Sequence, residues 1–339
     1  MIAQSVLAEP PNDAPTEQRD PVTSLVTVET VIEPRRPWQF IDLAELWRYR
    51  DLFVLLAWRD VSVRYKQTFL GIAWAVLRPA LLMVIFTIFV GPAIGAGGAD
   101  ARYPLYVYCG MLLWTMFSTA LSASAESVVG AERLITKVYF PRLLIPFAAA
   151  APAVVDFAFG GILLIGLLFA YGVVPSTAIL LSPLPILAAA LLAMSIGCLL
   201  AALNVVYRDV RYAVPFVIQA GLFATPAIYL PSNPTEPATV ETAANSREEA
   251  AQIDSADKVK AEPNDAPSLN VEKQGASALR TWVTLLNPMN AIIEFFRATL
   301  TGVPLPWQDF GVSCGFVAII VPLSAAIFRR FESSFADLI

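Results

Sequence analysis

Two long apolar stretches decide the fold class of this chain. Residues 147–173 read FAAAAPAVVDFAFGGILLIGLLFAYGV, and residues 184–206 read LPILAAALLAMSIGCLLAALNVV. Asp156 is the one acidic or basic residue in either stretch. A helix needs about 20 consecutive, mostly apolar residues to cross the hydrocarbon core of a bilayer. Each stretch is therefore predicted to be a transmembrane helix.

Four further stretches have the same character. Together they give six predicted spans, near residues 69–95, 103–125, 147–173, 184–206, 213–230 and 310–328. An even number of spans places both termini on one side of the membrane. Lys and Arg collect before the first span, in the second-to-third and fourth-to-fifth loops, and after the last span. By the positive-inside rule, both termini are predicted to be cytoplasmic.

The composition predicts an all-α integral membrane protein. The 339 residues are 57% hydrophobic and 15% charged, and the mean hydropathy is +0.62. Soluble domains carry about 25% charged residues. The acidic residues that give the net charge of −5 concentrate in residues 1–33 and 232–280, and the rest of the chain is mildly basic. This pattern argues against a soluble globular enzyme and against a nucleic-acid partner.

Three segments outside the spans have distinct compositions. Residues 1–37 are rich in Pro, and the extracytoplasmic insert 231–280 is rich in Pro, Ala and acids, so both are predicted to be disordered. Residues 38–66 predict an amphipathic helix at the membrane interface, although Arg50 falls within its apolar arc. The alternative for this segment is a buried helix of a small soluble domain. The apolar residues that share the arc are Leu43, Leu46, Trp47, Phe53, Val54, Trp58 and Val61.

The residue types exclude several kinds of chemistry. The chain contains no His, which removes His-based acid–base catalysis and His metal ligation. Its cysteines, Cys109, Cys198 and Cys314, lie singly in apolar runs and are predicted to be small core residues. A nucleotide-binding loop needs Gly-Lys-Ser/Thr, and no Lys follows a Gly here. We therefore expect neither an ATPase site nor a metal or cofactor bound by this chain.

Ionisable residues inside predicted spans are costly and therefore informative. Arg78 lies near the middle of the first span and either snorkels or faces an anionic substrate headgroup. Asp156, in the third span, either pairs with a polar group on another helix or has a direct role in function. With Arg64 and Lys66 just before the first span, Arg78 forms a predicted headgroup gate.

Aromatic residues gather at the outer end of the second span. They form either an ordinary interfacial belt or a channel-lining stripe on which sugar rings stack. Their offsets of 0, 3, 11 and 14 place them on one helix face. The predicted channel-lining residues are Tyr103, Tyr106, Trp114 and Phe117.

The loop 126–142 mixes charged residues with an apolar patch. A solvated loop has no use for such a patch, whereas a cytoplasmic helix that docks into a partner's groove does. The alternative is a loop that packs on its own bundle. The predicted coupling residues are Glu132, Leu134, Lys137, Tyr139, Phe140 and Arg142.

Several motifs, in order along residues 37–339, together resemble the membrane permease subunits of ABC-2 type polysaccharide exporters, which move O-antigen, teichoic acid or capsule-like glycans. The matching sequences are RDVSVRYKQTFLG at 59–71, WAVLRP at 74–79, LITKVYFPR at 134–142, YRDV at 207–210, ATPAIY at 224–229, LNPM at 286–289 and FESSFAD at 331–337. The insert near 232–278 departs from the family pattern.

The resemblance implies a homodimer of six-span subunits with separate ATPase subunits that bind ATP and Mg. It implies that residues 126–142 carry the coupling helix, that residues 38–66 lie at the cytoplasmic gate, and that residues 281–306 form short outer gate helices. The leading function is export of a lipid-linked polysaccharide across the cell membrane. The alternatives are an ABC-2 exporter of a drug or small lipid, a membrane-embedded glycosyltransferase and a structural scaffold.

Overall fold

The computed structural model describes most of the predicted membrane region. The described residues are 43–66, 71–92, 102–138, 140–173, 177–225, 287–332 and 335. They belong to one of two units of the chain, Phe40–Ile339. The tail 1–37, the insert 231–280 and the coupling residue Tyr139 lie outside the described residues.

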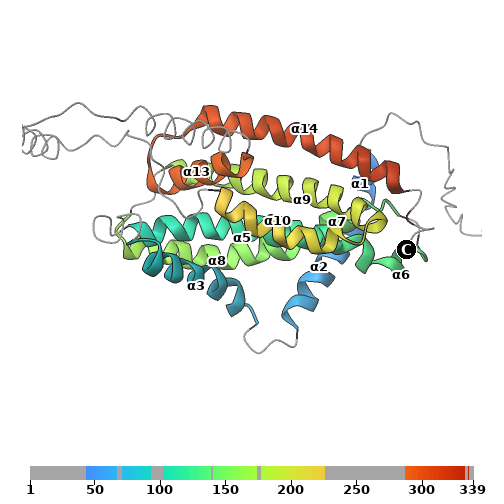
Figure 1. Cartoon of the computed structure of the whole chain (residues 1–339), viewed down its shortest axis with the longest axis horizontal. Coiled ribbons are helices and arrows are strands. Elements are labelled where there is room, and N and C mark those ends of the chain that lie inside the picture. The colour runs from blue at the N-terminus through green and yellow to red at the C-terminus, as the bar shows by residue number, and fades with distance from the viewer. Residues whose placement is uncertain are drawn as a thin grey trace, which may run out of the picture. The chain divides into compact units, whose positions relative to one another are not determined.

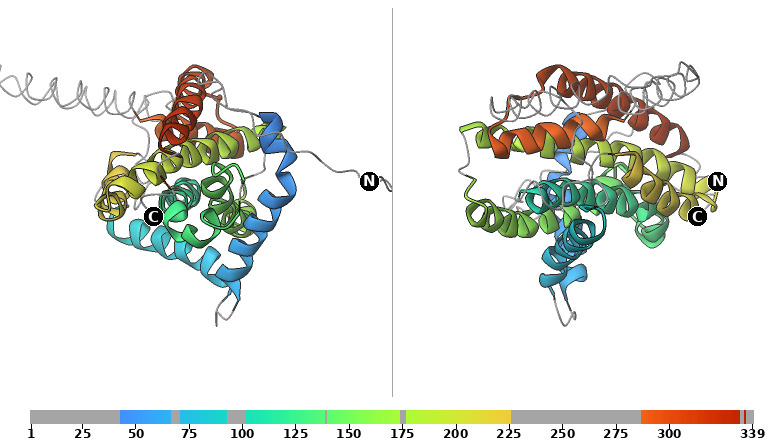
Figure 2. Two further views of the ribbon diagram at one scale, coloured as in Figure 1. Left: turned by 90° about the vertical axis from the view of Figure 1, so that its right-hand side faces the viewer. Right: turned by 60° about the vertical axis from the view of Figure 1, so that its left-hand side comes forward.

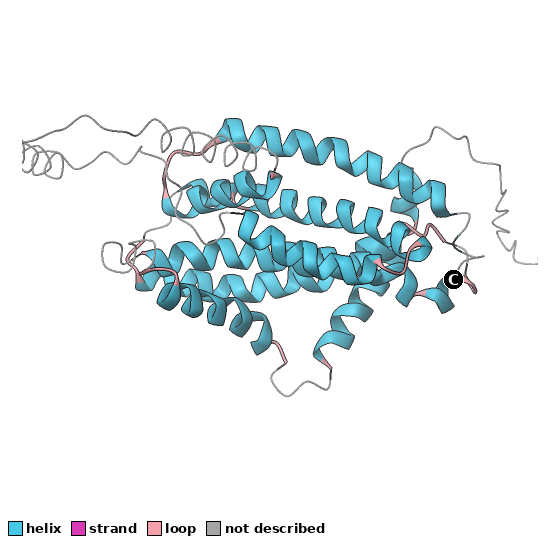
Figure 3. Ribbon diagram, in the orientation of Figure 1, coloured by secondary structure: helices cyan, strands magenta, loops and turns pink. Residues whose placement is uncertain are grey.

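The described part of the chain is helical and contains no strand (Figure 3). The predicted all-α class is therefore confirmed. The α-helices are α1 (Leu43–Arg48), α2 (Arg50–Tyr65), α3 (Ala73–Phe89), α5 (Tyr103–Gly130), α6 (Glu132–Ile135), α7 (Leu144–Ala149), α8 (Ala151–Ala170), α9 (Pro183–Val206), α10 (Val210–Ala224), α13 (Pro288–Thr301) and α14 (Trp307–Glu332). A short 3-10 helix, η1 (Thr177–Leu181), precedes α9.

Four helical segments of the described chain are long and apolar enough to cross a membrane: Tyr103–Gly130, Leu144–Ala170, Thr177–Val206 and Trp307–Glu332. They coincide with the predicted second, third, fourth and sixth spans. The predicted first and fifth spans correspond to the shorter apolar helices α3 and α10. Length and composition thus support four crossings, and the total of six stays a prediction.

Helix α5 is the centre of the packing (Figures 1 and 2). It packs against α8 and α9, and α9 in turn packs against α14. A glycine lets α5 and α9 approach closely, because a Cβ at Gly197 would lie 2.4 Å from the Cβ of Ser124. The buried Asn204 amide donates to the Ala125 carbonyl at 3.1 Å and joins the same two helices. The buried Asn204 amide is thus paired inside the apolar bundle.

The predicted interfacial helix forms two helices, α1 and α2, with a break at Tyr49. Leu56 is buried where α2 packs against α7 and α8, whereas Trp47 and Trp58 are about two-thirds exposed, at 70% and 69%. The segment therefore has one apolar side toward the bundle and another facing outward. Arg50, the exception in the predicted arc, lies 5.3 Å above the Trp47 ring.

Residues 281–286 of the predicted outer gate segment lie outside the described residues, and the described part of the segment contains helix α13. Its start follows from Asn287, whose side chain accepts a hydrogen bond from the Met289 N–H at 3.1 Å, and from Pro288 at the first helical position. Its end follows from Gly302, which adopts a left-handed φ of 74°. Most of α13 is buried, so it belongs to the bundle core.

Candidate functional site

A cavity of about 1120 Å³ lies among five helices of the bundle. Helices α2, α3, α5, α8 and α10 all contribute side chains to it. Its walls combine cationic, hydroxyl and apolar groups, which is unusual within helices of this hydropathy. Among the residues that line it are Arg64, Tyr65, Trp74, Arg78, Leu81, Met111, Trp114, Thr115, Ser118, Thr119, Ser122, Glu126, Asp156, Ile218, Gln219 and Leu222.

The carboxylate of Asp156 links α8 to α2 at the cavity wall. The Arg64 Nη2 atom lies 2.7 Å from the Asp156 Oδ2 atom, and the Tyr65 hydroxyl donates to the Asp156 Oδ1 atom. Burial and this hydrogen bond raise the pKa of Tyr65 above its ordinary value, so the phenol stays protonated and continues to donate. Of the two alternatives for Asp156, the interhelical pair is the one that the structure shows.

The predicted headgroup gate is assembled only in part. Arg64 and Arg78 come from different helices, α2 and α3, and both line the cavity. Arg78 is exposed and forms no ion pair with another described residue. Lys66 is also exposed, but it does not line this cavity, because it follows the end of α2. The structure therefore places one free and one paired arginine at the site.

The predicted aromatic stripe on α5 packs mainly inside the subunit. Tyr103 and Phe117 are buried in the core, and the Phe117 ring lies 5.5 Å from the Trp114 ring. Of the four predicted residues, Trp114 alone lines the cavity, and it is likewise largely buried, with 6% of its surface exposed. Neighbouring helices cover most of these side chains because α5 is central. In this single subunit, Tyr103, Tyr106 and Phe117 do not line the cavity.

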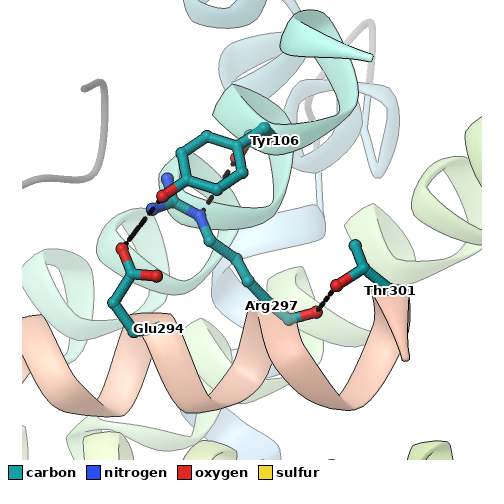
Figure 4. A network of polar contacts seen from close by, with 4 residues as sticks. All are labelled: Tyr106, Glu294, Arg297 and Thr301. Atoms are coloured by element: carbon teal, nitrogen blue, oxygen red, sulfur yellow. Dashed lines mark hydrogen bonds and ion pairs between the residues drawn. The ribbon is translucent and has the colours of Figure 1, made fainter. Parts of the chain in front are cut away.

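Tyr106 instead belongs to a polar network with α13 (Figure 4). Its hydroxyl donates to the Glu294 Oε1 atom at 3.0 Å, and its ring lies 3.5 Å from the Arg297 guanidinium carbon. Arg297 also donates to the Tyr106 carbonyl at 3.2 Å and to Glu294 at 3.0 Å. Sequence reasoning missed this buried arginine, although a Glu and an Arg three residues apart in an apolar segment would have been a signal.

A row of hydroxyl groups on α5 was also missed. Thr115, Ser118, Thr119 and Ser122 all line the cavity and are all partly exposed. Their spacing of three and four residues is that of one helix face. The spacing is visible in the sequence, but Ser and Thr are common in membrane helices, so only the cavity distinguishes this row.

The predicted coupling residues divide into two groups. Glu132 and Lys137 are exposed in and just after α6, and Leu134 is half-buried. Phe140 is buried in the subunit's own packing, and the Arg142 Nη1 atom donates to the Glu332 carbonyl at 2.5 Å. The second half of the loop thus packs on its own bundle, which was the alternative interpretation of this loop.

Comparisons with known proteins give a matching family and named relatives. Residues 51–237 match the family described as ABC-2 type transporter. The chain is 30% identical to the O-antigen export system permease protein RfbA of Myxococcus xanthus over 185 residues, which are 55% of this chain and 70% of that protein. It is 26% identical to a protein of the same name from Klebsiella pneumoniae over 292 residues, 85% of this chain and 95% of the relative.

Proposed function

This chain belongs to the ABC-2 type transporter family, and on that premise we propose that it is the permease subunit of an ATP-driven exporter of lipid-linked polysaccharide. The observation that carries the proposal is the cavity with Arg64, Arg78 and a hydroxyl row inside an apolar bundle. The two relatives named as O-antigen export permeases support the polysaccharide cargo.

The proposed assembly is a homodimer in the cell membrane with cytoplasmic termini. A separate ABC ATPase subunit binds ATP and Mg and hydrolyses the nucleotide, because this chain lacks the Gly-Lys-Ser/Thr loop. The exposed Glu132 and Lys137 beside α6 are the groups available to meet that partner. Phe140 and Arg142 then act indirectly, since their packing against the end of α14 holds the loop in place.

The proposed cargo enters with its anionic headgroup at the arginines. Arg78 has no acidic partner among the described residues, so a phosphate group gains a new ion pair there without breaking another. Arg64 must first leave Asp156, to which it is bound at 2.7 Å. We therefore assign first contact to Arg78, and to Arg64 a later contact that opens the link between α2 and α8.

The test is export in proteoliposomes that contain this chain and its cognate ATPase. Arg78→Gln should abolish export of lipid-linked glycan, and Arg78→Lys should retain part of it. Arg211→Gln is the matched control, because Arg211 is an exposed arginine that does not line the cavity. The chain alone should hydrolyse no ATP.

Two results would overturn the proposal. Robust ATP hydrolysis by the purified chain alone would show that the energy source is not a partner. Normal glycan export by Arg78→Gln would show that Arg78 is not needed to bind the anionic headgroup. The apolar cavity residues Leu81, Met111 and Ile218 favour the alternative, a small lipid or drug cargo. That alternative would be supported if such compounds, and not glycan, stimulated ATP hydrolysis by the complex.

A further inference from the structure

We propose that the hydroxyl row of α5, formed by Thr115, Ser118, Thr119 and Ser122, is a binding surface for the sugar units of the cargo. This inference rests on the proposed function and replaces the aromatic stripe as the glycan-contacting surface. It concerns the passage of the sugar chain, whereas the arginines concern the headgroup.

The hydroxyl row lies on the side of α5 that faces the cavity. The four residues are all partly exposed to the cavity, while their neighbours Met116, Phe117, Ala120 and Leu121 are buried in the core. In a helix of this length the side chains at i, i+3, i+4 and i+7 lie along one face. The cavity-facing side of α5 thus carries these four hydroxyl groups together with Met111 and Trp114.

Most of these hydroxyls have no hydrogen-bond partner among the described residues. Several Ser and Thr side chains elsewhere in the bundle donate to carbonyls of their own helix, as Ser195 does to Leu191 at 2.7 Å and Ser324 does to Val321 at 2.9 Å; the buried Thr87 hydroxyl is an exception without a partner among the described residues. In the row, only Ser118 does so, to Thr115 at 3.1 Å. Among the described residues, Thr115, Thr119 and Ser122 form no side-chain hydrogen bond.

Unpaired hydroxyl groups are costly in an apolar environment, so this face requires water or a polar ligand. Other polar groups share the cavity with it. Gln219 of α10 is exposed and lines the cavity, and so does Arg78 of α3. The row therefore faces an open space with further polar groups and not a neighbouring helix.

The ligand chemistry follows from the donors and acceptors present. Each Ser or Thr hydroxyl offers one donor and two acceptor positions, and the Gln amide offers both kinds of group. Sugar hydroxyls have the same dual character, so many orientations of a pyranose can pair with the row. Neutral hydrogen bonds of this kind are individually weak. A ladder of such bonds holds a polymer without stopping it at one position.

The experiment removes the hydroxyls and keeps the side-chain volume. The test variant is Thr115→Val, Ser118→Ala, Thr119→Val and Ser122→Ala combined, assembled with the cognate ATPase in proteoliposomes. The probe is purified lipid-linked glycan from the source cells, separated by chain length. Each lost hydrogen bond is worth about 2- to 10-fold in affinity, so long-chain export should fall by about tenfold or more. Export of the lipid carrier with one sugar unit should change much less.

Two controls separate this inference from a fold defect. Ser195→Ala with Ser324→Ala removes two hydroxyls that lie outside the cavity and should leave long-chain export unchanged. Thr115→Ser with Thr119→Ser retains the hydroxyls and should also retain export.

Unchanged long-chain export by the fourfold variant would overturn the hydroxyl row as a glycan surface. If Arg78→Gln still blocked export in the same assay, the proposed function would stand without it. Equal loss for short and long cargo, or loss in the Thr→Ser variant, would likewise overturn the inference. Failure of the wild-type complex to export any glycan would instead refute the proposed function.

Discussion

The buried guanidinium of Arg297 should be a principal determinant of stability at the contact between α5 and α13. We consider Arg297→Met, which removes the charge and the hydrogen bonds while it retains most of the apolar volume. The wild-type side chain is 3% exposed. It donates to Glu294 at 3.0 Å and to the Tyr106 carbonyl at 3.2 Å, and it stacks on the Tyr106 ring at 3.5 Å.

The expected cost follows from these contacts. Removing one partner of a buried ion pair costs about 3–5 kcal/mol, because the remaining charge stays uncompensated. The Glu294 side chain is 24% exposed and still accepts from the Tyr106 hydroxyl, so water and this bond relieve part of the penalty. We therefore expect Arg297→Met to lower the free energy of unfolding by about 3 kcal/mol, near the lower end of this range. Adding Glu294→Gln should recover about 1–2 kcal/mol, since no carboxylate is then left unpaired.

Thermal unfolding in detergent with a thiol-reactive dye measures this effect. Cys109 and Cys198 are buried and report unfolding, while Cys314→Ser removes the more accessible thiol. At about 2–4 °C per kcal/mol, Arg297→Met should lower the midpoint by about 6–12 °C. Arg78→Met is the matched control and should shift it little. If the two variants shifted the midpoint equally, the network would be irrelevant to stability and this reasoning would be wrong.

Three further outcomes test the packing, the cavity link and the coupling loop. Gly197→Ala should destabilise the bundle by about 1–3 kcal/mol through overpacking against α5, whereas Gly161→Ala, where no atom lies within 4 Å of the new Cβ, should be nearly neutral in the same assay. Arg64→Asp and Asp156→Arg should each reduce export, and the double exchange should restore part of it; no recovery would argue against the ion pair as the link between α2 and α8. Lys137→Glu should weaken co-purification with the ATPase, and a complex of unchanged affinity and salt dependence would exclude a role in docking.

Helix identity was predictable because it depends on local patterns. The apolar run at residues 184–206 coincides with α9, which begins at Pro183 and ends at Val206. Pro288 and Gly302 mark the start and end of α13, as their backbone preferences require. Sequence alone shows where such a helix starts and stops, but not that most of α13 packs into the core.

The candidate site was predictable only in part. Arg64, Arg78 and Trp114 were expected at functional positions, and the cavity contains all three. Phe117 was expected at the same place and is buried, because which sides of α5 are covered depends on the several helices that pack against it. The hydroxyl row and the Arg297 network were missed for the same reason: each acquires its meaning from a helix distant in sequence.

By itself, the sequence determined that this protein is an apolar all-α chain with spans long enough to cross a membrane, and that it resembles ABC-2 polysaccharide permeases. These properties follow from hydropathy over windows of about 20 residues and from short motifs, both of which are local. Only the tertiary structure decided which arginine is free and which is held by Asp156, and which face of α5 meets open space. The neighbours of a membrane-spanning helix decide which of its faces is buried and which is exposed. A nearly uniform apolar sequence gives little indication of which face that will be.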